Sequence, residues 1–180
     1  MIFFRSLLFN IQFYLGTSIL VTICLPCLLF PREVVIFVNK IWCSIMSQGL
    51  KWWLNTEIKV IGQIPSKKRV VIYAIKHQSA WETIFCTHIF SMPSIVIKKA
   101  LIFLPVIGLY FLRAGAIPIT RDQGLNALRK MGRNAKKAVK EKRSMMIFPQ
   151  GTRVKPGITS KEKPYLPGVF FLYSQANVPV

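Results

Sequence analysis

Two short blocks in this 180-residue chain contain side chains that could carry out chemistry together. The block KHQSAWE, residues 76–82, holds His77 followed five positions later by Glu82. The block FPQGTR, residues 148–153, ends in Arg153. Imidazole is the usual general base near neutral pH, and a guanidinium binds phosphate in bidentate fashion. A base combined with an anion clamp is what acyl transfer to a phosphorylated alcohol requires.

His77 directly follows an apolar, β-branched run, residues 69–75, that predicts a buried strand. In a continuous helix five residues turn about 500°, so His77 and Glu82 would not share a face. The two side chains can meet only if His77 precedes a helix and Glu82 lies in its first turn. Residues 79–82 fit a capping box with Ser79 as the N-cap. The sequence leaves open whether Glu82 orients His77 or only caps the helix.

The second block follows another predicted strand, residues 144–148, and reads as a turn that presents polar groups. Gly151 allows close approach of the backbone, Thr152 offers a hydroxyl, and Arg153 can hold a phosphate. An arginine after a turn is also common as a plain surface residue, so this block alone does not distinguish an anion site from an ordinary surface loop.

Two more cations come directly after predicted strands. Lys98 follows residues 94–97, and Arg121 follows residues 116–120, although Arg121 could simply pair with Asp122. Active sites of open α/β sheets gather at the carboxyl ends of the strands. We therefore expect these cations to converge with Arg153 at one edge of a sheet.

Strands alternate with helices through the second part of the chain. Helices are predicted over residues 79–90, 101–112 and 123–143, between the four strands named above, and the second of them is interrupted by Pro105 and Gly108. The alternation predicts an α/β fold with a mostly parallel central sheet flanked by helices, in a domain covering residues 58–180.

The sequence of the first part, residues 1–57, predicts a membrane-associated helical segment. Residues 6–31 carry no charged side chain, whereas about 20 apolar residues suffice to span a bilayer. Tryptophans beside lysines in residues 34–54 suit a membrane interface. A spanning, a re-entrant and an interfacial helix all remain open, with a buried soluble helix as the alternative. No Ala-x-Ala cleavage site follows, which argues against a signal peptide.

The charge balance is strongly basic, with 25 Lys+Arg against 6 Asp+Glu, in a chain that is 52% hydrophobic. That combination favours an anionic membrane surface over nucleic acid as the partner. Helix 123–143 carries many of the cations on one side, either as a solvated face or as a contact for anionic lipid. Cys24 and Cys27 have metal-like spacing but lack further ligands, so no metal site is expected.

Taken in order, the blocks resemble those of the glycerolipid acyltransferases, most closely the 1-acyl-sn-glycerol-3-phosphate (lysophosphatidic acid) acyltransferases. Members of that family have a histidine followed, after four intervening residues, by an aspartate; His77 and Glu82 stand at these two positions here. The other matching segments are Lys98–Leu101 with Pro105 and Gly108, Gly115–Arg121, Phe148–Arg153 and Gly168–Val180. The similarity covers about residues 70–180.

The resemblance implies that His77, oriented by Glu82, takes a proton from the free hydroxyl of lysophosphatidic acid. The alkoxide then attacks the thioester of acyl-CoA or acyl-carrier protein, giving phosphatidic acid for phospholipid synthesis. The acceptor's phosphate would be held by Arg153, Gly151, Thr152, Arg121 and Lys98. The resemblance implies no metal and no cofactor, membrane lipids as partners, and a membrane protein whose catalytic domain faces the cytoplasm.

Three positions depart from the family pattern: Glu82 replaces Asp, Gln150 replaces Glu, and Leu166 stands where many relatives have a polar or basic residue. The loss of charge at Gln150 argues against a catalytic role there. Relatives also continue past Val180, so the resemblance predicts a domain truncated at its C-terminus. The alternatives are an acyltransferase for another lysolipid or glycerol 3-phosphate, and an inactive, truncated membrane-binding protein.

Overall fold

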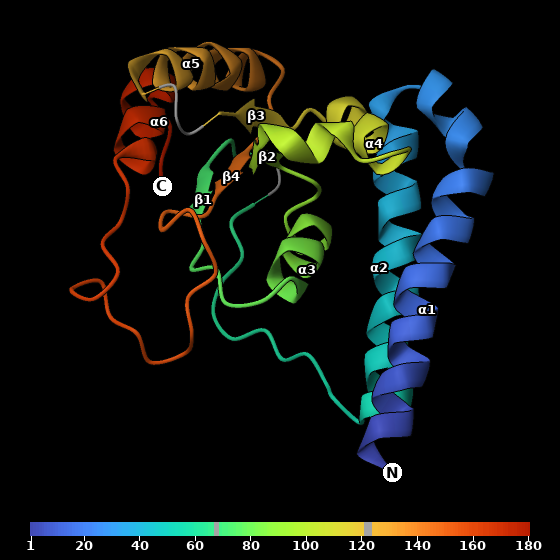
Figure 1. Ribbon diagram of the computed structural model, residues 1–180. Helices are drawn as coiled ribbons and strands as arrows, with labels where there is room; N and C mark the ends of the chain where they lie inside the picture. The colour runs from blue at the N-terminus through green and yellow to red at the C-terminus, as the bar shows by residue number, and fades with distance from the viewer. Residues whose placement is uncertain (67–68, 121–123) are drawn as a thin grey trace. The chain divides into compact units, whose positions relative to one another are not determined.

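The computed structural model describes residues 1–66, 69–120 and 124–180 (Figure 1). The chain divides into two compact units, Met1–Ile64 and Pro65–Val180. The sequence placed a boundary after residue 57, close to the end of the last helix of the first unit.

The first unit is a helical hairpin. It consists of α1 (Ile2–Ile23), the short 3-10 helix η1 (Leu25–Leu29) and α2 (Arg32–Leu54). Proline in the first turn of η1 accompanies the break between the two long helices, because proline cannot continue an α-helix. Helix α2 ends at Asn55, which adopts a left-handed conformation.

Polar side chains tie the two long helices together. The Trp42 indole N–H donates to the Thr17 hydroxyl over 3.0 Å, and the Trp53 indole N–H donates to Gln12 Oε1 over 2.6 Å. Gln12 Nε2 in turn donates to the carbonyl of Ile45 over 3.0 Å. A Cβ added to Gly49 would lie 2.5 Å from the Gln12 amide, so glycine makes this approach possible. These three bonds satisfy polar groups between the two helices, an arrangement that suits an apolar surrounding.

Helix α1 is long and apolar enough to cross a membrane, with a mean hydropathy of 1.5 over its most apolar window and none of that window buried. Its exposed side chains include Phe3, Phe4 and Tyr14. A signal sequence near an N-terminus would pass the same length and composition test. The finding supports membrane association, and the choice between spanning, re-entrant and interfacial placement stays a prediction.

The second unit is built on a four-stranded parallel sheet, as the sequence predicted. The strands are β1 (Ile72–Ala74), β2 (Ser94–Lys98), β3 (Ile117–Ile119) and β4 (Met145–Ile147), in the spatial order β1-β4-β2-β3. The last strand along the chain therefore lies between the first two. Ile72 pairs with Met145, and Ser94 pairs with the same methionine from the other side.

Helices cover both faces of the sheet, which makes a three-layer α/β unit (Figure 1). One face packs against α5 (Gly124–Lys140) and α6 (Gly168–Ala176), through residues such as Met131 and Leu172. The other face packs against α3 (Trp81–Ile89), the 3-10 helix η2 (Lys99–Phe103) and α4 (Ile107–Ala114). Buried apolar side chains on both sides of each strand explain why the strands are continuous hydrophobic runs.

The helical stretch predicted over residues 101–112, with interruptions at Pro105 and Gly108, divides into η2 and α4, so the break at Pro105 is confirmed, whereas Gly108 lies within α4. Pro105 interrupts the helical hydrogen bonding between them. Gly108 then lies so close to η2 that an added Cβ would be 2.1 Å from the Ile102 carbonyl oxygen. The Pro105 and Gly108 of the matching sequence segment therefore have structural roles.

Residues 177–180 follow α6, where the family resemblance implies a strand. The structure assigns them no strand, but they lie beside β1, because the Ile72 N–H donates to the Pro179 carbonyl over 2.8 Å.

Candidate active site

The polar blocks of the sequence follow strands whose carboxyl ends all point to one edge of the sheet. Because β1 and β4 are neighbours, His77 and the FPQGTR block come from adjacent strands, about 4.8 Å apart. Lys98 ends β2, two strands from β1, or about 10 Å away. The strand order therefore brings His77, the FPQGTR block and Lys98 close together at one edge of the sheet, although they lie far apart in the sequence.

His77 and Glu82 meet, as the predicted helix start allowed. Nδ1 of His77 lies 2.7 Å from Oε1 of Glu82, and both side chains are largely buried. Helix α3 begins at Trp81, with Ala80 and not Ser79 at the N-cap, so the predicted cap residue was wrong by one position. The Ser79 hydroxyl still satisfies a helix donor, because it accepts from the Trp81 N–H over 3.0 Å.

The Glu82 carboxylate is surrounded by donors. It accepts from the Gln78 N–H over 2.5 Å, from the Ser79 N–H over 2.8 Å and from the Ser79 hydroxyl over 2.6 Å. Burial works against ionisation, but the bonds from Ser79 and His77 outweigh it and lower the Glu82 pKa to about 2. Glu82 therefore orders the turn before α3 and contacts His77 at the same time.

An ionised carboxylate can only accept hydrogen bonds, so Nδ1 of His77 must carry the proton in this pair. The other ring nitrogen, Nε2, is then left with its lone pair and can act as a base. The imidazole also stacks on the Phe148 ring, with centroids 4.1 Å apart and planes 21° apart. One contact fixes the tautomer and the other restrains the ring.

The FPQGTR block forms a turn against His77. The Gly151 N–H donates to the Phe148 carbonyl over 2.9 Å, with Gly151 at φ +67°, a conformation that favours glycine. The Val154 N–H donates to the His77 carbonyl over 2.7 Å. Thr152 and Arg153 are exposed on the loop that these bonds hold beside His77. Because its N–H is already bonded, Gly151 contributes the turn itself and no free donor.

Lys76 and Gln150 hold the following loop, a role that sequence reasoning missed. The Lys76 ammonium donates to the Ile158 carbonyl over 2.5 Å, and the buried Gln150 donates through Nε2 to the Lys163 carbonyl over 3.3 Å. Lys76 stood beside His77 in the first block, but its partner lies 82 residues away along the chain. No local pattern could have indicated that pairing.

The remaining predicted site residues are Lys98 and Arg121. Lys98 is exposed at the carboxyl end of β2, and Arg121 lies outside the described residues. Among the residues that the structure describes, no three His, Cys, Asp or Glu side chains cluster as metal ligands would, and the expectation of no metal stays a prediction.

The family model described as Acyltransferase matches residues 57–180. The chain belongs to the Acyltransferase family. The similarity to glycerolipid acyltransferases that the motifs indicated is therefore confirmed at the level of the family, and the match includes both chemical blocks.

Curated relatives carry more specific descriptions. The chain is 32% identical over 121 residues to a 1-acyl-sn-glycerol-3-phosphate acyltransferase of Pseudomonas aeruginosa, covering 67% of this chain and 45% of that protein. It is 27% identical over 134 residues to a Saccharomyces cerevisiae protein of the same description, covering 73% and 43%. The chain thus spans less than half the length of these relatives.

A solved structure confirms the fold. The crystal structure of the 1-acyl-sn-glycerophosphate (LPA) acyltransferase PlsC from Thermotoga maritima matches with a TM-score of 0.73 at 20% identity. The match covers 99% of this chain and 73% of that one. The α/β architecture assembled from the sequence pattern is therefore a known arrangement.

Proposed function

We propose that this acyltransferase-family chain transfers a fatty acyl group from a thioester to the free hydroxyl of 1-acylglycerol 3-phosphate, giving phosphatidic acid. The observation that carries the proposal is the His77–Glu82 pair, 2.7 Å apart, beside the loop that presents Arg153. The descriptions of the Pseudomonas and yeast relatives support the choice of acceptor.

In the proposed reaction Nε2 of His77 removes the proton from the acceptor hydroxyl as its oxygen attacks the thioester carbonyl. The tetrahedral intermediate collapses with loss of the thiolate, which takes the proton back from the imidazolium. Glu82 stabilises the positive ring that forms between these steps, and its low pKa keeps it ionised. General-base catalysis of this kind contributes about 10²–10⁴-fold.

The phosphate of the acceptor would be bound by the cations at the same sheet edge. Arg153 is the first candidate because its loop is bonded to the His77 backbone. Lys98 and Arg121 follow neighbouring strands and would complete the clamp, with the Thr152 hydroxyl as a neutral donor. Three such cations would suit a phosphomonoester, which carries up to two negative charges.

The proposal places the second unit at the cytoplasmic side of a membrane. The apolar α1 supports membrane association. The excess of lysine and arginine along the chain favours the cytoplasmic side, where positive residues and anionic lipid are concentrated. Acyl-CoA and acyl-carrier protein both remain candidate donors, and neither requires a bound cofactor.

The test is a transferase assay on the purified chain with lysophosphatidic acid and each donor in turn, measuring phosphatidic acid by mass spectrometry. His77→Ala should lower turnover by about 10²–10⁴-fold, whereas His88→Ala, a change in the second histidine of the chain, should not. Parent-like turnover by His77→Ala would refute the mechanism. Absence of product from the parent chain with both donors would favour the membrane-binding alternative.

A further inference from the structure

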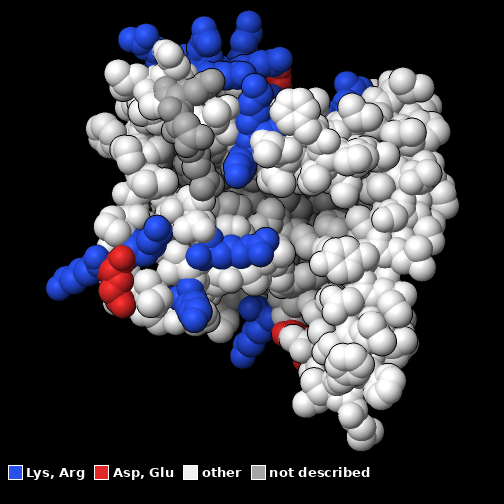
Figure 2. All heavy atoms as spheres, viewed as in Figure 1, with Lys and Arg blue, Asp and Glu red and all other residues white. Residues whose placement is uncertain are grey.

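Helix α5 is divided sharply into a buried and a charged side. Ala127, Met131, Ala135 and Ala138 are buried in the core of the second unit. The exposed side bears six cations: Arg129, Lys130, Arg133, Lys136, Lys137 and Lys140. Figure 2 shows lysine and arginine side chains gathered over this helix. Neither the motifs nor the proposed reaction uses these residues.

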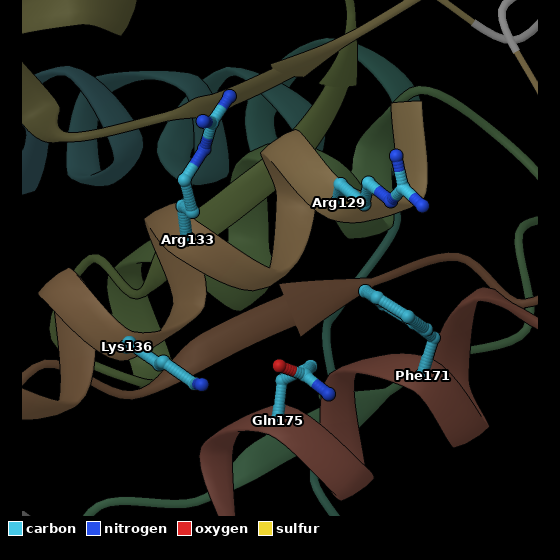
Figure 3. A pocket seen from close by; sticks show the side chains of 5 residues that line it. All are labelled: Arg129, Arg133, Lys136, Phe171 and Gln175. Atoms are coloured by element: carbon cyan, nitrogen blue, oxygen red, sulfur yellow. The ribbon is translucent and has the colours of Figure 1, made fainter. Parts of the chain in front are cut away.

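An open groove of about 470 Å³ runs between α5 and α6 (Figure 3). Its lining consists of Arg129, Arg133, Lys136, Phe171 and Gln175. Lys136 extends toward Gln175, and Phe171 points from α6 toward α5.

Gly132 allows the two helices to lie this close. A Cβ at that position would be 2.9 Å from Phe171 Cε1 and 3.0 Å from Gln175 Cγ. The groove therefore depends on a glycine facing α6, and the cations flank a defined hollow instead of a flat helix surface.

The cations of the groove are available to a ligand. Within the described part of the chain, no carboxylate lies at ion-pair distance from Arg129, Arg133 or Lys136. Glu141, the acidic residue that follows α5, pairs instead with Lys137 and Arg143. The groove thus concentrates uncompensated positive charge, which favours an anion with several acceptor oxygens.

Apolar side chains in and beside the groove indicate the kind of anion. Phe171 lines the groove, and Leu125, one turn before Arg129 on the same side of α5, is 71% exposed. Aromatic and aliphatic side chains next to lysine and arginine are typical of surfaces that meet the headgroup region of a bilayer. An acidic protein or a nucleic acid would match the cations but not these neighbours.

We propose that the α5–α6 groove binds the headgroup phosphate of an anionic phospholipid. Arg129, Arg133 and Lys136 hold the phosphate, and the Gln175 amide serves as a neutral partner for headgroup hydroxyls. Phe171 and Leu125 lie at the level of the glycerol and the first acyl carbons. The groove lies in the helix layer on one face of the sheet, whereas His77 lies at the carboxyl edge, so this site is separate from the proposed reaction centre.

The experiment uses the full chain in neutral detergent micelles, titrated with dihexanoylphosphatidylglycerol and followed by isothermal calorimetry. Dihexanoylphosphatidylcholine, inorganic phosphate and coenzyme A form the other arms. The groove variant is Arg129→Gln/Arg133→Gln/Lys136→Gln. The matched control, Lys130→Gln/Lys137→Gln/Lys140→Gln, removes the same charge from the same helix outside the groove.

We expect the anionic lipid to bind more tightly than the zwitterionic one, and the groove variant to lose about 10- to 100-fold in affinity. The control variant should change by less than about threefold. Equal losses of affinity in the groove and control variants would mean that the lipid responds to the overall positive charge of α5 and that the groove is not a specific site. Tighter binding of coenzyme A in the groove, or no binding of the anionic lipid, would also overturn the proposal. Arg133→Gln alone, expected to lose about fivefold, serves if the triple variant fails to fold.

Discussion

Two arginines flank β4 at opposite ends, and their surroundings differ. Arg143, just before the strand, donates to the Ser94 hydroxyl over 2.5 Å and to the Gly115 carbonyl over 3.2 Å, and it pairs with Glu141. Arg153, just after the strand, is exposed, and in the described ranges it has no ion-pair partner. One side chain is fixed by the protein, while the other remains open to a ligand.

The difference separates the two edges of the sheet. At the amino edge Arg143 joins the starts of β2 and β4 to the end of α4, so its contacts are part of the fold. Gly115 is needed there, because an added Cβ would collide with the guanidinium. At the carboxyl edge the backbone is equally well bonded, but the side chains of Thr152 and Arg153 project away from it. Loss of an arginine should therefore cost stability at one edge and activity at the other.

Arg143→Met should give the largest effect on stability. Removing the guanidinium leaves the fully buried Ser94 without this donor and Glu141 without its close partner. We expect a loss of about 3 kcal/mol in the free energy of unfolding, measured by chemical denaturation in detergent. Turnover of the folded fraction should stay near that of the parent. If Arg143→Met lowered turnover without lowering stability, the proposed difference between the amino and carboxyl edges would be wrong.

Arg153→Ala should act on the acceptor and not on the fold. Loss of charge-assisted bonds to a phosphate costs about 2 kcal/mol, or about 30-fold in kcat/KM, with the free energy of unfolding changed by less than about 0.5 kcal/mol. Lys155→Ala, in the same exposed loop, is the control. The defect should disappear with an acceptor that lacks a phosphate, and a uniform defect across acceptors would count against the clamp.

Glu82→Gln tests whether the carboxyl edge also contributes to stability through the largely buried Glu82 carboxylate. A folded pKa near 2, below the usual value of 4.5, stabilises the fold above about pH 4.5, and this is lost as the pH falls toward 2. The variant should be about 1–2 kcal/mol less stable at pH 7, and the gap should close between about pH 5 and pH 2. Unfolding curves of the parent and of Glu82→Gln, measured across this pH range, test the prediction. If the difference in stability between the two proteins did not depend on pH, ionisation of Glu82 would not be the source of the stabilisation.

Lys76→Met should give the smallest effect. The bond to the Ile158 carbonyl restrains the loop that carries Arg153, so its loss should lower kcat/KM by about two- to tenfold. Lys161→Met, an exposed change in the same loop, serves as the reference. If the two variants behave alike in steady-state kinetics, the Lys76 contact does not position the site.

Much of this arrangement could be predicted from local pattern. Short apolar runs indicated all four strands, and the spacing of Ser79 and Glu82 indicated a helix start that would allow His77 and Glu82 to meet. The strand order could not be predicted, because it depends on how the connecting helices cross the sheet. For the same reason no sequence pattern indicated that Phe148 stacks on His77 or that Lys76 bonds to the Ile158 carbonyl. Contacts across 70 or more residues are set by tertiary packing, which short-range periodicity does not encode.

The central position of β4 has a consequence for the chain as it is made. Ile72 must wait for Met145, about 70 residues later, before β1 acquires its neighbour. At a synthesis rate of about 5–20 residues per second, that leaves the edge of β1 without this neighbour for about 4–14 s on the ribosome. An unpaired parallel edge invites association with other chains. The base and the clamp therefore come together only in one of the last steps of folding, and a nascent chain that stops before β4 has a histidine but no site.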